Sequence, residues 1–168
     1  MVFRERLFLD PPTVFYNDEK WNLHVPDALP YTELENIGIE WSYEVIFSTK
    51  RDDTTLATLY HDYISEQLSQ FSTSYPSLHI AALITEPVIH AAEGMHMIDS
   101  LFQRVLVKEC QTQGMPVIFD EVFTGFLVSW SRVCCRASRL YARYCMLCQV
   151  VDWWSCSFCC HVGNTIGL

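Results

Sequence analysis

The sequence predicts an α/β fold in which helices flank a parallel sheet, and three consecutive segments carry this prediction. Residues 79–87, HIAALITEP, form a short apolar run that stops at a Glu-Pro pair, as a buried strand does. Residues 116–119 form a second short apolar run, and a helical pattern over about 99–113 lies between the two. A strand, a helix and a strand within about 40 residues are typical of the βαβ unit of a parallel sheet.

The helix over about 99–113 has residues at both ends that suit helix termini. Asp99 or Ser100 can cap its first turn, and Gly114 can take the left-handed conformation that ends a helix. Its inward-facing residues are predicted to be Leu101, Val105 and Leu106.

The first half of the chain predicts one more helix and two loops. Apolar residues recur at helical spacing over about 54–72, and Asp53 or Thr54 can cap that helix. Residues 7–15, LFLDPPTVF, begin apolar, but the Pro-Pro pair forces extended backbone, so we expect a loop or an edge segment. Residues 17–40 are rich in Asn, Asp, Pro and Glu, and we expect them to form surface loop.

Charge and composition argue against several classes of protein. The 168 residues carry a net charge of −9, whereas a nucleic-acid-binding protein needs a basic face. The chain contains no apolar run of about 18 residues or more, so we expect no transmembrane helix. The N-terminal MVFRERLFLDPP has no long apolar core, so we expect no signal peptide. The default expectation is a soluble intracellular chain without nucleic-acid or membrane partners.

The composition changes abruptly near residue 127. Nineteen of the 20 acidic residues lie in residues 1–126, whereas seven of the eight cysteines and three of the five tryptophans lie in residues 127–168. We therefore divide the chain into residues 1–126, which hold the βαβ unit, and a Cys/Trp-rich tail, residues 127–168.

A carboxylate follows each of the two predicted strands. Glu86 ends the first strand and Asp120 follows the second. The carboxyl ends of parallel strands meet at one edge of the sheet, and ligands of open α/β sheets bind at that edge. Spacing alone leaves three roles open for these residues: they can cap loops or helix N-termini, bind Mg²⁺, or pair with a cationic heterocycle.

The motifs AALITEPV and GMHMIDSLFQRVLVKECQTQGMPVIFDEVFTGF resemble those of class III pyridoxal-phosphate (PLP) aminotransferases of fold type I. The likeness is closest to the diaminopelargonate aminotransferases of biotin synthesis, in the form that fungi and plants fuse to dethiobiotin synthetase. It covers about residues 5–126, including LFLDPPTVF. It implies an incomplete part of the large cofactor-binding domain, PLP as cofactor, homodimers and a mitochondrial location. The implied reaction is amino transfer to 8-amino-7-oxononanoate, giving 7,8-diaminononanoate, with S-adenosylmethionine as the usual donor.

The resemblance assigns roles to individual residues. Asp120 matches the aspartate that pairs with the protonated pyridine nitrogen of the cofactor; such a carboxylate keeps the nitrogen protonated and makes the ring a better electron sink. Val122 matches the residue that packs on the face of the ring. Glu86 matches the glutamate of the Glu-Pro motif on the substrate side, near the active-site arginines.

The chain also departs from the family, and we expect it to be inactive as written. The expected turn HAAEGM has Ala and Glu where the family usually has small, Gly-rich residues. The family's phosphate-binding segment lies upstream of LFLDPP. No lysine has the PDI…AK…TGG context of the Schiff-base lysine, because the chain contains only Lys20, Lys50 and Lys108. Without that lysine we expect no covalent attachment of PLP.

A displaced reading frame explains the composition of the tail. When the tail is back-translated and read one base on, Trp153-Trp154 becomes Gly-Gly, because Trp has a single codon. The shifted tail is compatible with SAAELLG…PDI…AKLLTGG, and its lysine straddles the codons of Gln149 and Val150. We interpret the frame as slipping at about 127–129.

Two other functions remain open. The chain can belong to another class III aminotransferase, acting on ornithine or 4-aminobutyrate. Alternatively, the tail forms a non-enzymatic zinc-binding module from two Cys-x-x-Cys pairs and a histidine. The seven residues between the pairs are fewer than a zinc ribbon usually has, so we expect no metal site. The candidate zinc ligands are Cys145, Cys148, Cys156, Cys159 and His161.

Overall fold

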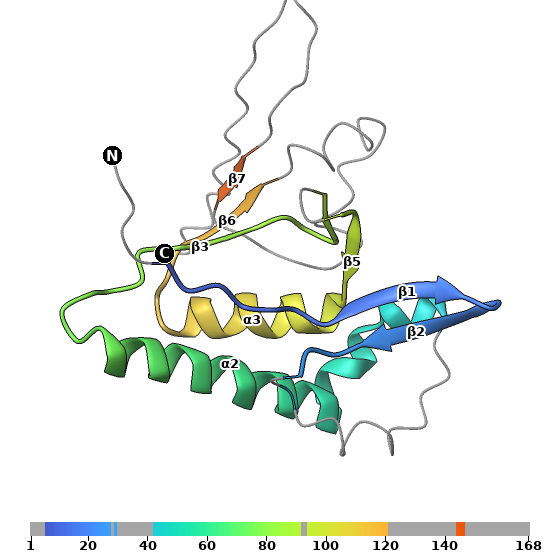
Figure 1. Cartoon of the computed structure of the whole chain (residues 1–168), viewed down its shortest axis with the longest axis horizontal. Helices are drawn as coiled ribbons and strands as arrows, with labels where there is room; N and C mark the ends of the chain where they lie inside the picture. Colours follow the sequence, from blue (N-terminus) through green and yellow to red (C-terminus); the bar gives the residue numbers. More distant parts are fainter. Residues whose placement is uncertain (1–5, 28, 30–41, 92–93, 121–143, 147–168) are drawn as a thin grey trace, which may run out of the picture.

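The computed structural model describes residues 6–27, 29, 42–91, 94–120 and 144–146, and Figure 1 shows them as an α/β arrangement. In chain order the elements are β1 (Thr13–Asn17), β2 (Lys20–His24), α1 (Tyr43–Ile46), the 3₁₀ helix η2 (Thr49–Asp53), α2 (Thr55–Ser74), β3 (Leu83–Thr85), β4 (Ile89–His90), β5 (His96–Ile98), α3 (Ser100–Thr112), β6 (Val117–Asp120) and β7 (Tyr144–Met146). No helix within this described part is long and apolar enough to cross a bilayer.

The predicted βαβ unit is present. β3 and β6 pair in parallel, with Leu83 opposite Val117 and Thr85 opposite Phe119, and α3 connects them. β7 adds a third parallel strand beside β6, giving the order β3-β6-β7. The first strand is shorter than the predicted 79–87, because its ladder begins where the Leu83 amide donates to the Pro116 carbonyl.

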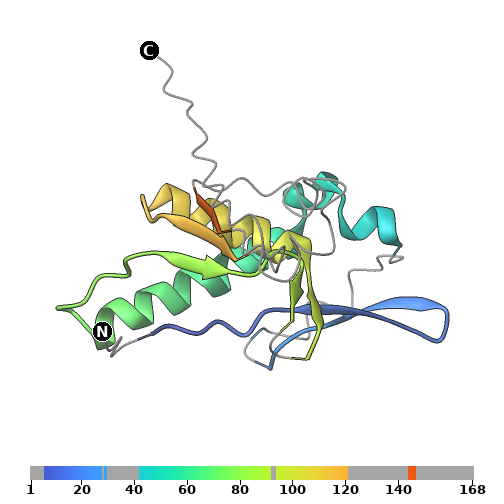
Figure 2. The same ribbon diagram turned by 90° about the horizontal axis from the view of Figure 1, so that it is seen from above.

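A second, antiparallel sheet corrects two of the expectations. Its strand order is β2-β1-β5-β4, so residues 13–15 belong to an interior strand, whereas residues 7–12 of the expected loop or edge lie outside any strand or helix. β2 lies within the expected surface loop of residues 17–40. Figure 2 shows β1 and β2 as a hairpin whose tip projects beyond the helices. The hairpin was not predicted from the sequence because its two-residue turn is Asp18-Glu19, which lacks the glycine that usually marks such turns.

Both long helices occur where periodicity predicts them, and they form most of the core. α3 lies between α2 and the parallel strands in Figure 1. The rings of Tyr60 and Phe102 meet edge to face, with centroids 5.4 Å apart, and Phe119 of β6 is fully buried beside them. Asp99 caps α3 by accepting a hydrogen bond from the Leu101 amide, as predicted.

Only one face of the parallel sheet is covered by the described residues. Val117 and Phe119 of β6 point into the core against α3. Ile118 and Asp120 alternate with them and are half-buried on the other face. Ile84, opposite Ile118, leaves 64% of its surface exposed on that face. Asp120 therefore lies on the sheet face that α3 does not occupy.

A buried ion pair joins the segment before α2 to the start of α3. Both terminal nitrogens of Arg51 donate to Asp99, at 2.7 Å each, and the Tyr60 hydroxyl donates to the same carboxylate at 3.0 Å. Arg51 is 4% exposed and Asp99 is fully buried. Burial, and then the charge of Asp99 and the hydrogen bond to it, raise the pKa of Tyr60 well above its usual value, so the phenol remains a donor at neutral pH.

Replacing Arg51 by methionine should lower the free energy of unfolding by about 3–5 kcal/mol, because Asp99 would then be a buried charge without its cation. Arg104→Met is the comparison: its partner Asp52 is 41% exposed and stays solvated, so the loss should be smaller, about 1–2 kcal/mol, although Arg104 is itself 9% exposed and also donates to Ser48 and Ser100. Urea denaturation of the three proteins measures both values. Equal losses for the two variants would contradict this ranking.

Replacing Glu19 by glycine should stabilise the chain by up to about 1 kcal/mol. Glu19 has φ +62, in the left-handed region that glycine adopts without a steric penalty. Lys20→Gly is the control, because Lys20 is an exposed residue inside β2 and glycine there should be destabilising. In thermal unfolding, the Tm should decrease in the order Glu19→Gly, wild type, Lys20→Gly. The reverse order would show that the turn is not strained.

Candidate active site at the carboxyl edge of the parallel sheet

The two predicted carboxylates lie on one edge of the parallel sheet. Asp120 is the last residue of β6, and Glu86 follows the last residue of β3. Because Thr85 stands opposite Phe119, the next residue of each strand follows at the same edge. The prediction that both residues lie on this edge is confirmed.

Asp120 is held by backbone pairing at a strand end. Its neighbour in the ladder is Met146 of β7, and its side chain is half-buried on the face opposite α3. A carboxylate fixed on such an edge can stabilise a cation placed against it, and partial burial strengthens that attraction. This arrangement suits a protonated ring nitrogen.

Glu86 holds the loop that follows β3. Its Oε2 accepts a hydrogen bond of 2.7 Å from the amide of Ala91, and its main-chain carbonyl accepts one of 2.8 Å from the side chain of Gln103. Loop capping was one of the roles that spacing left open, and the structure shows it for Glu86. Its proposed substrate-side role remains a prediction.

Gln103 is a residue at this edge that the sequence did not reveal. It is 2% exposed, and besides Glu86 its side chain bonds to Val88, whose amide donates to Oε1 at 3.0 Å. Val88 has φ +68, which is rare for a β-branched residue. The only signal in the sequence was a polar residue among inward-facing positions of a helix.

The described residues fit one contact of PLP but not its covalent attachment. Asp120 can pair with the pyridine nitrogen. The three lysines are exposed and lie outside the parallel strands: Lys20 in β2, Lys50 in η2 and Lys108 in α3. Val122, predicted to pack on the ring, lies outside the described residues.

The predicted zinc ligands fall almost wholly outside the described residues. Cys145 lies in β7, whereas Cys148, Cys156, Cys159 and His161 are not described. Within residues 6–27, 29, 42–91, 94–120 and 144–146, no three His, Cys, Asp or Glu side chains are grouped to hold a metal. Cys110 of α3 is buried, and burial raises the pKa of its thiol to about 11, so it stays protonated at neutral pH.

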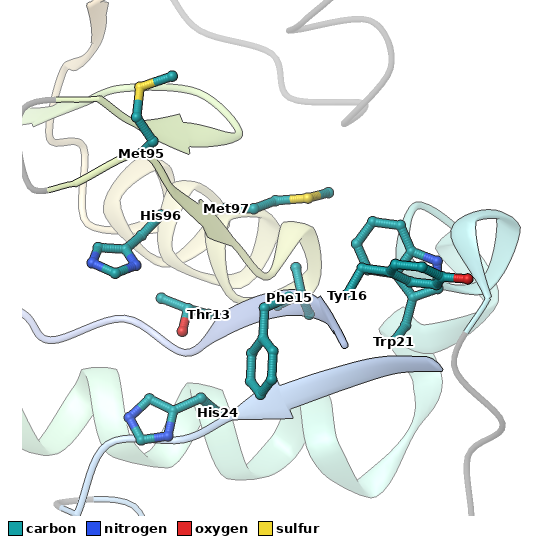
Figure 3. Close-up of a pocket in the computed structure, with 9 residues that line it drawn as sticks. Thr13, Phe15, Tyr16, Trp21, His24, Met95, His96 and Met97 are labelled. Atoms are coloured by element: carbon teal, nitrogen blue, oxygen red, sulfur yellow. The ribbon is translucent and has the colours of Figure 1, made fainter. Parts of the chain in front are cut away.

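An open hollow of about 520 Å³ lies on the antiparallel sheet, which is a different sheet from the one that carries Asp120. In Figure 3, Phe15 and His24 point to one side of the hairpin, while Tyr16 and Trp21 contact each other on the other side. The remaining labelled residues that line it are Thr13, Met95, His96 and Met97. Its lining contains no carboxylate, so we place the candidate active site at Asp120.

No protein-family model matches the chain. The chain is 52% identical over 120 residues to a bifunctional dethiobiotin synthetase/7,8-diamino-pelargonic acid aminotransferase of Arabidopsis thaliana, a match of 71% of this chain and 14% of that protein. It is 32% identical over 140 residues to a bifunctional dethiobiotin synthetase/adenosylmethionine-8-amino-7-oxononanoate aminotransferase of Emericella nidulans, covering 70% and 18%.

A third relative, whose name gives an aminotransferase alone, indicates that this chain matches the aminotransferase part of the bifunctional proteins. The adenosylmethionine-8-amino-7-oxononanoate aminotransferase of Buchnera aphidicola is 29% identical over 76 residues, which is 44% of this chain and 18% of that protein. The chain thus spans less than a fifth of each of these relatives. The resemblance seen in the motifs is confirmed, and the chain belongs, as one segment, to the aminotransferase family of the bifunctional dethiobiotin synthetase/diaminopelargonate aminotransferases.

Proposed function

We propose that the chain is a segment of a PLP-dependent aminotransferase of biotin synthesis, which transfers an amino group to 8-amino-7-oxononanoate to give 7,8-diaminononanoate. The observation that carries this proposal is Asp120: a carboxylate ends a parallel strand within a segment 52% identical to a plant diaminopelargonate aminotransferase. S-adenosylmethionine is the proposed amino donor. The names of the relatives favour this reaction over transfer from ornithine or 4-aminobutyrate.

The roles proposed for Asp120 and Glu86 follow from their places at the sheet edge, and the role proposed for Val122 follows from the resemblance alone. Bound PLP supplies an electron sink for the carbon that loses its proton. Asp120 accepts the N–H of the pyridine ring and holds that proton in place, because a carboxylate beside the nitrogen favours its charged form. Val122 packs on the face of the ring. Glu86 shapes the substrate side of the edge through the loop that it holds.

We also propose that the chain as written does not catalyse the reaction. A Schiff base needs a lysine near Asp120, and none of the three lysines lies in the parallel strands. The displaced-frame interpretation would supply a lysine in this region. β7 lies beside β6 with Met146 opposite Asp120, and in the shifted frame a lysine arises at the codons of Gln149 and Val150, shortly after β7. That frame would therefore introduce a lysine shortly after the strand next to Asp120.

The longer protein is proposed to act in mitochondria, because the Arabidopsis thaliana relative is named mitochondrial. It is also proposed to act as a homodimer, the usual assembly of PLP aminotransferases. The sheet face around Asp120 and Ile84, which the described helices leave open, is compatible with further protein enclosing the cofactor there.

Titration with PLP tests the role of Asp120. The wild-type chain should bind PLP weakly, and Asp120→Asn should reduce that affinity about tenfold or more, because the amide cannot neutralise a protonated pyridine nitrogen. Asp52→Asn, at an exposed carboxylate paired with Arg104, is the control and should leave binding unchanged. If Asp120→Asn binds PLP as well as the wild type does, Asp120 is not the partner of the ring nitrogen.

Sequencing the genomic locus and its transcript across the codons for Phe126 to Ser155 tests the lysine argument. We expect one inserted or lost base, or an unspliced intron, that joins Phe126 to a lysine-bearing frame. At the protein level, borohydride reduction with PLP should leave no stoichiometric adduct on Lys20, Lys50 or Lys108. A transcript that encodes the tail as written, or a trapped adduct on one of these lysines, would show the interpretation to be wrong.

A further inference from the structure

The corner that follows β3 has an unusual backbone conformation. Val88 has φ +68, and left-handed backbone is unfavourable for a residue branched at Cβ. Both of its peptide groups are nevertheless fixed: its amide donates to Gln103, and its carbonyl accepts a 2.8 Å bond from the amide of Ile98. Such a conformation persists only where its surroundings enforce it.

One side chain holds both ends of this corner. Gln103 Nε2 donates to the carbonyl of Glu86, and Gln103 Oε1 accepts from the amide of Val88. The backbone partners fix the orientation of the amide, because a carbonyl can only accept and an N–H can only donate. Pro87, between them, has no N–H of its own, so Gln103 satisfies both polar groups that the corner turns toward α3.

The position of Gln103 in the helix makes an ordinary packing role a poor explanation. It lies one turn into α3, is 2% exposed, and adjoins Phe102, which belongs to the apolar core. Leucine or methionine would fill such a site without desolvating an amide. A glutamine there is favourable only because both ends of its amide are bonded to the corner.

We infer that Gln103 is a positioning residue, which locks the Glu86–Val88 corner in its left-handed conformation and so sets the Glu86 side of the candidate active site. The locked corner is what allows the Glu86 carboxylate to accept the Ala91 amide, at 2.7 Å. The effect of Gln103 on cofactor binding rests on the proposed function, whereas its effect on the conformation of the corner is independent of that function.

The test uses the full 168-residue chain and four variants. Gln103→Met keeps the volume and removes both hydrogen bonds. Val88→Gly makes a positive φ free of steric cost. The third variant combines the two, and Val107→Ala, a buried site on the same helix, is the matched control. Amide hydrogen exchange at residues 88 and 91 is compared with exchange in the core of α2, which reports global unfolding.

Gln103→Met should speed exchange at Val88 and Ala91 about tenfold more than in the α2 core. Val88→Gly should restore most of the protection of the Ala91 amide in the Gln103→Met background, since glycine adopts the positive φ of the corner without a steric cost and depends less on Gln103. Val107→Ala should speed exchange in the α2 core, which reports global unfolding, without a selective effect on the amides of Val88 and Ala91. Unchanged local protection in Gln103→Met, or no rescue by Val88→Gly, would overturn the inference.

Titration with PLP separates this inference from the proposed function. Weaker PLP binding in Gln103→Met that Val88→Gly restores supports a positioning role toward the cofactor. Unchanged binding in a variant whose corner has opened overturns that role. If the wild-type chain binds no PLP, the proposed contact between Asp120 and the cofactor fails for this chain, while the exchange measurements still decide whether Gln103 locks the corner.

Discussion

The buried carboxylate of Asp99 is the constraint on which the rest of the structure depends. It is fully buried, and an uncompensated charge in that position would be very unfavourable, so each of its partners is fixed in place. Arg51 reaches it from η2, Tyr60 from α2, and the amide of Leu101 from the first turn of α3. The amide of Asp99 itself donates to the Pro12 carbonyl, just before β1. One side chain and its own peptide group thereby join η2, the two long helices and the segment that enters β1 of the antiparallel sheet.

The candidate active site takes its geometry from α3, and α3 takes its position from Asp99. Gln103, about one turn along the helix, reaches the corner after β3 and the loop that Glu86 holds. At the other end, Gly114 with φ +74 turns the chain into β6, which ends at Asp120. The two carboxylates of the edge are thus fixed by opposite ends of one helix. Arg104 supports its first end from the outside by pairing with Asp52 at 2.6 Å.

Elements with local signals could be predicted from the sequence, and elements that depend on distant partners could not. α2, α3 and β6 have clear periodicity, caps or apolar runs, and the strand-end rule placed Glu86 and Asp120 on one edge correctly. β1 and β2 were missed because their turn has no glycine and because β1 is completed by β5, more than 80 residues away. Arg51 and Gln103 are polar residues whose burial depends on partners 48 and 15–17 residues away, and no local pattern shows those partners.

Ring binding and covalent attachment are physically separate tasks, and the role proposed for Asp120 concerns only the first. Asp120 offers a charge to a pyridine nitrogen on a half-buried edge, where such an attraction contributes on the order of 1–3 kcal/mol. That supports only weak binding, so tight binding requires a phosphate site and a lysine bond as well. Ile84 and Ile118 border the same open face, and parallel sheets are ordinarily covered on both faces. Protein that covered this face, beyond the described helices, would therefore lie beside the proposed cofactor contact at Asp120.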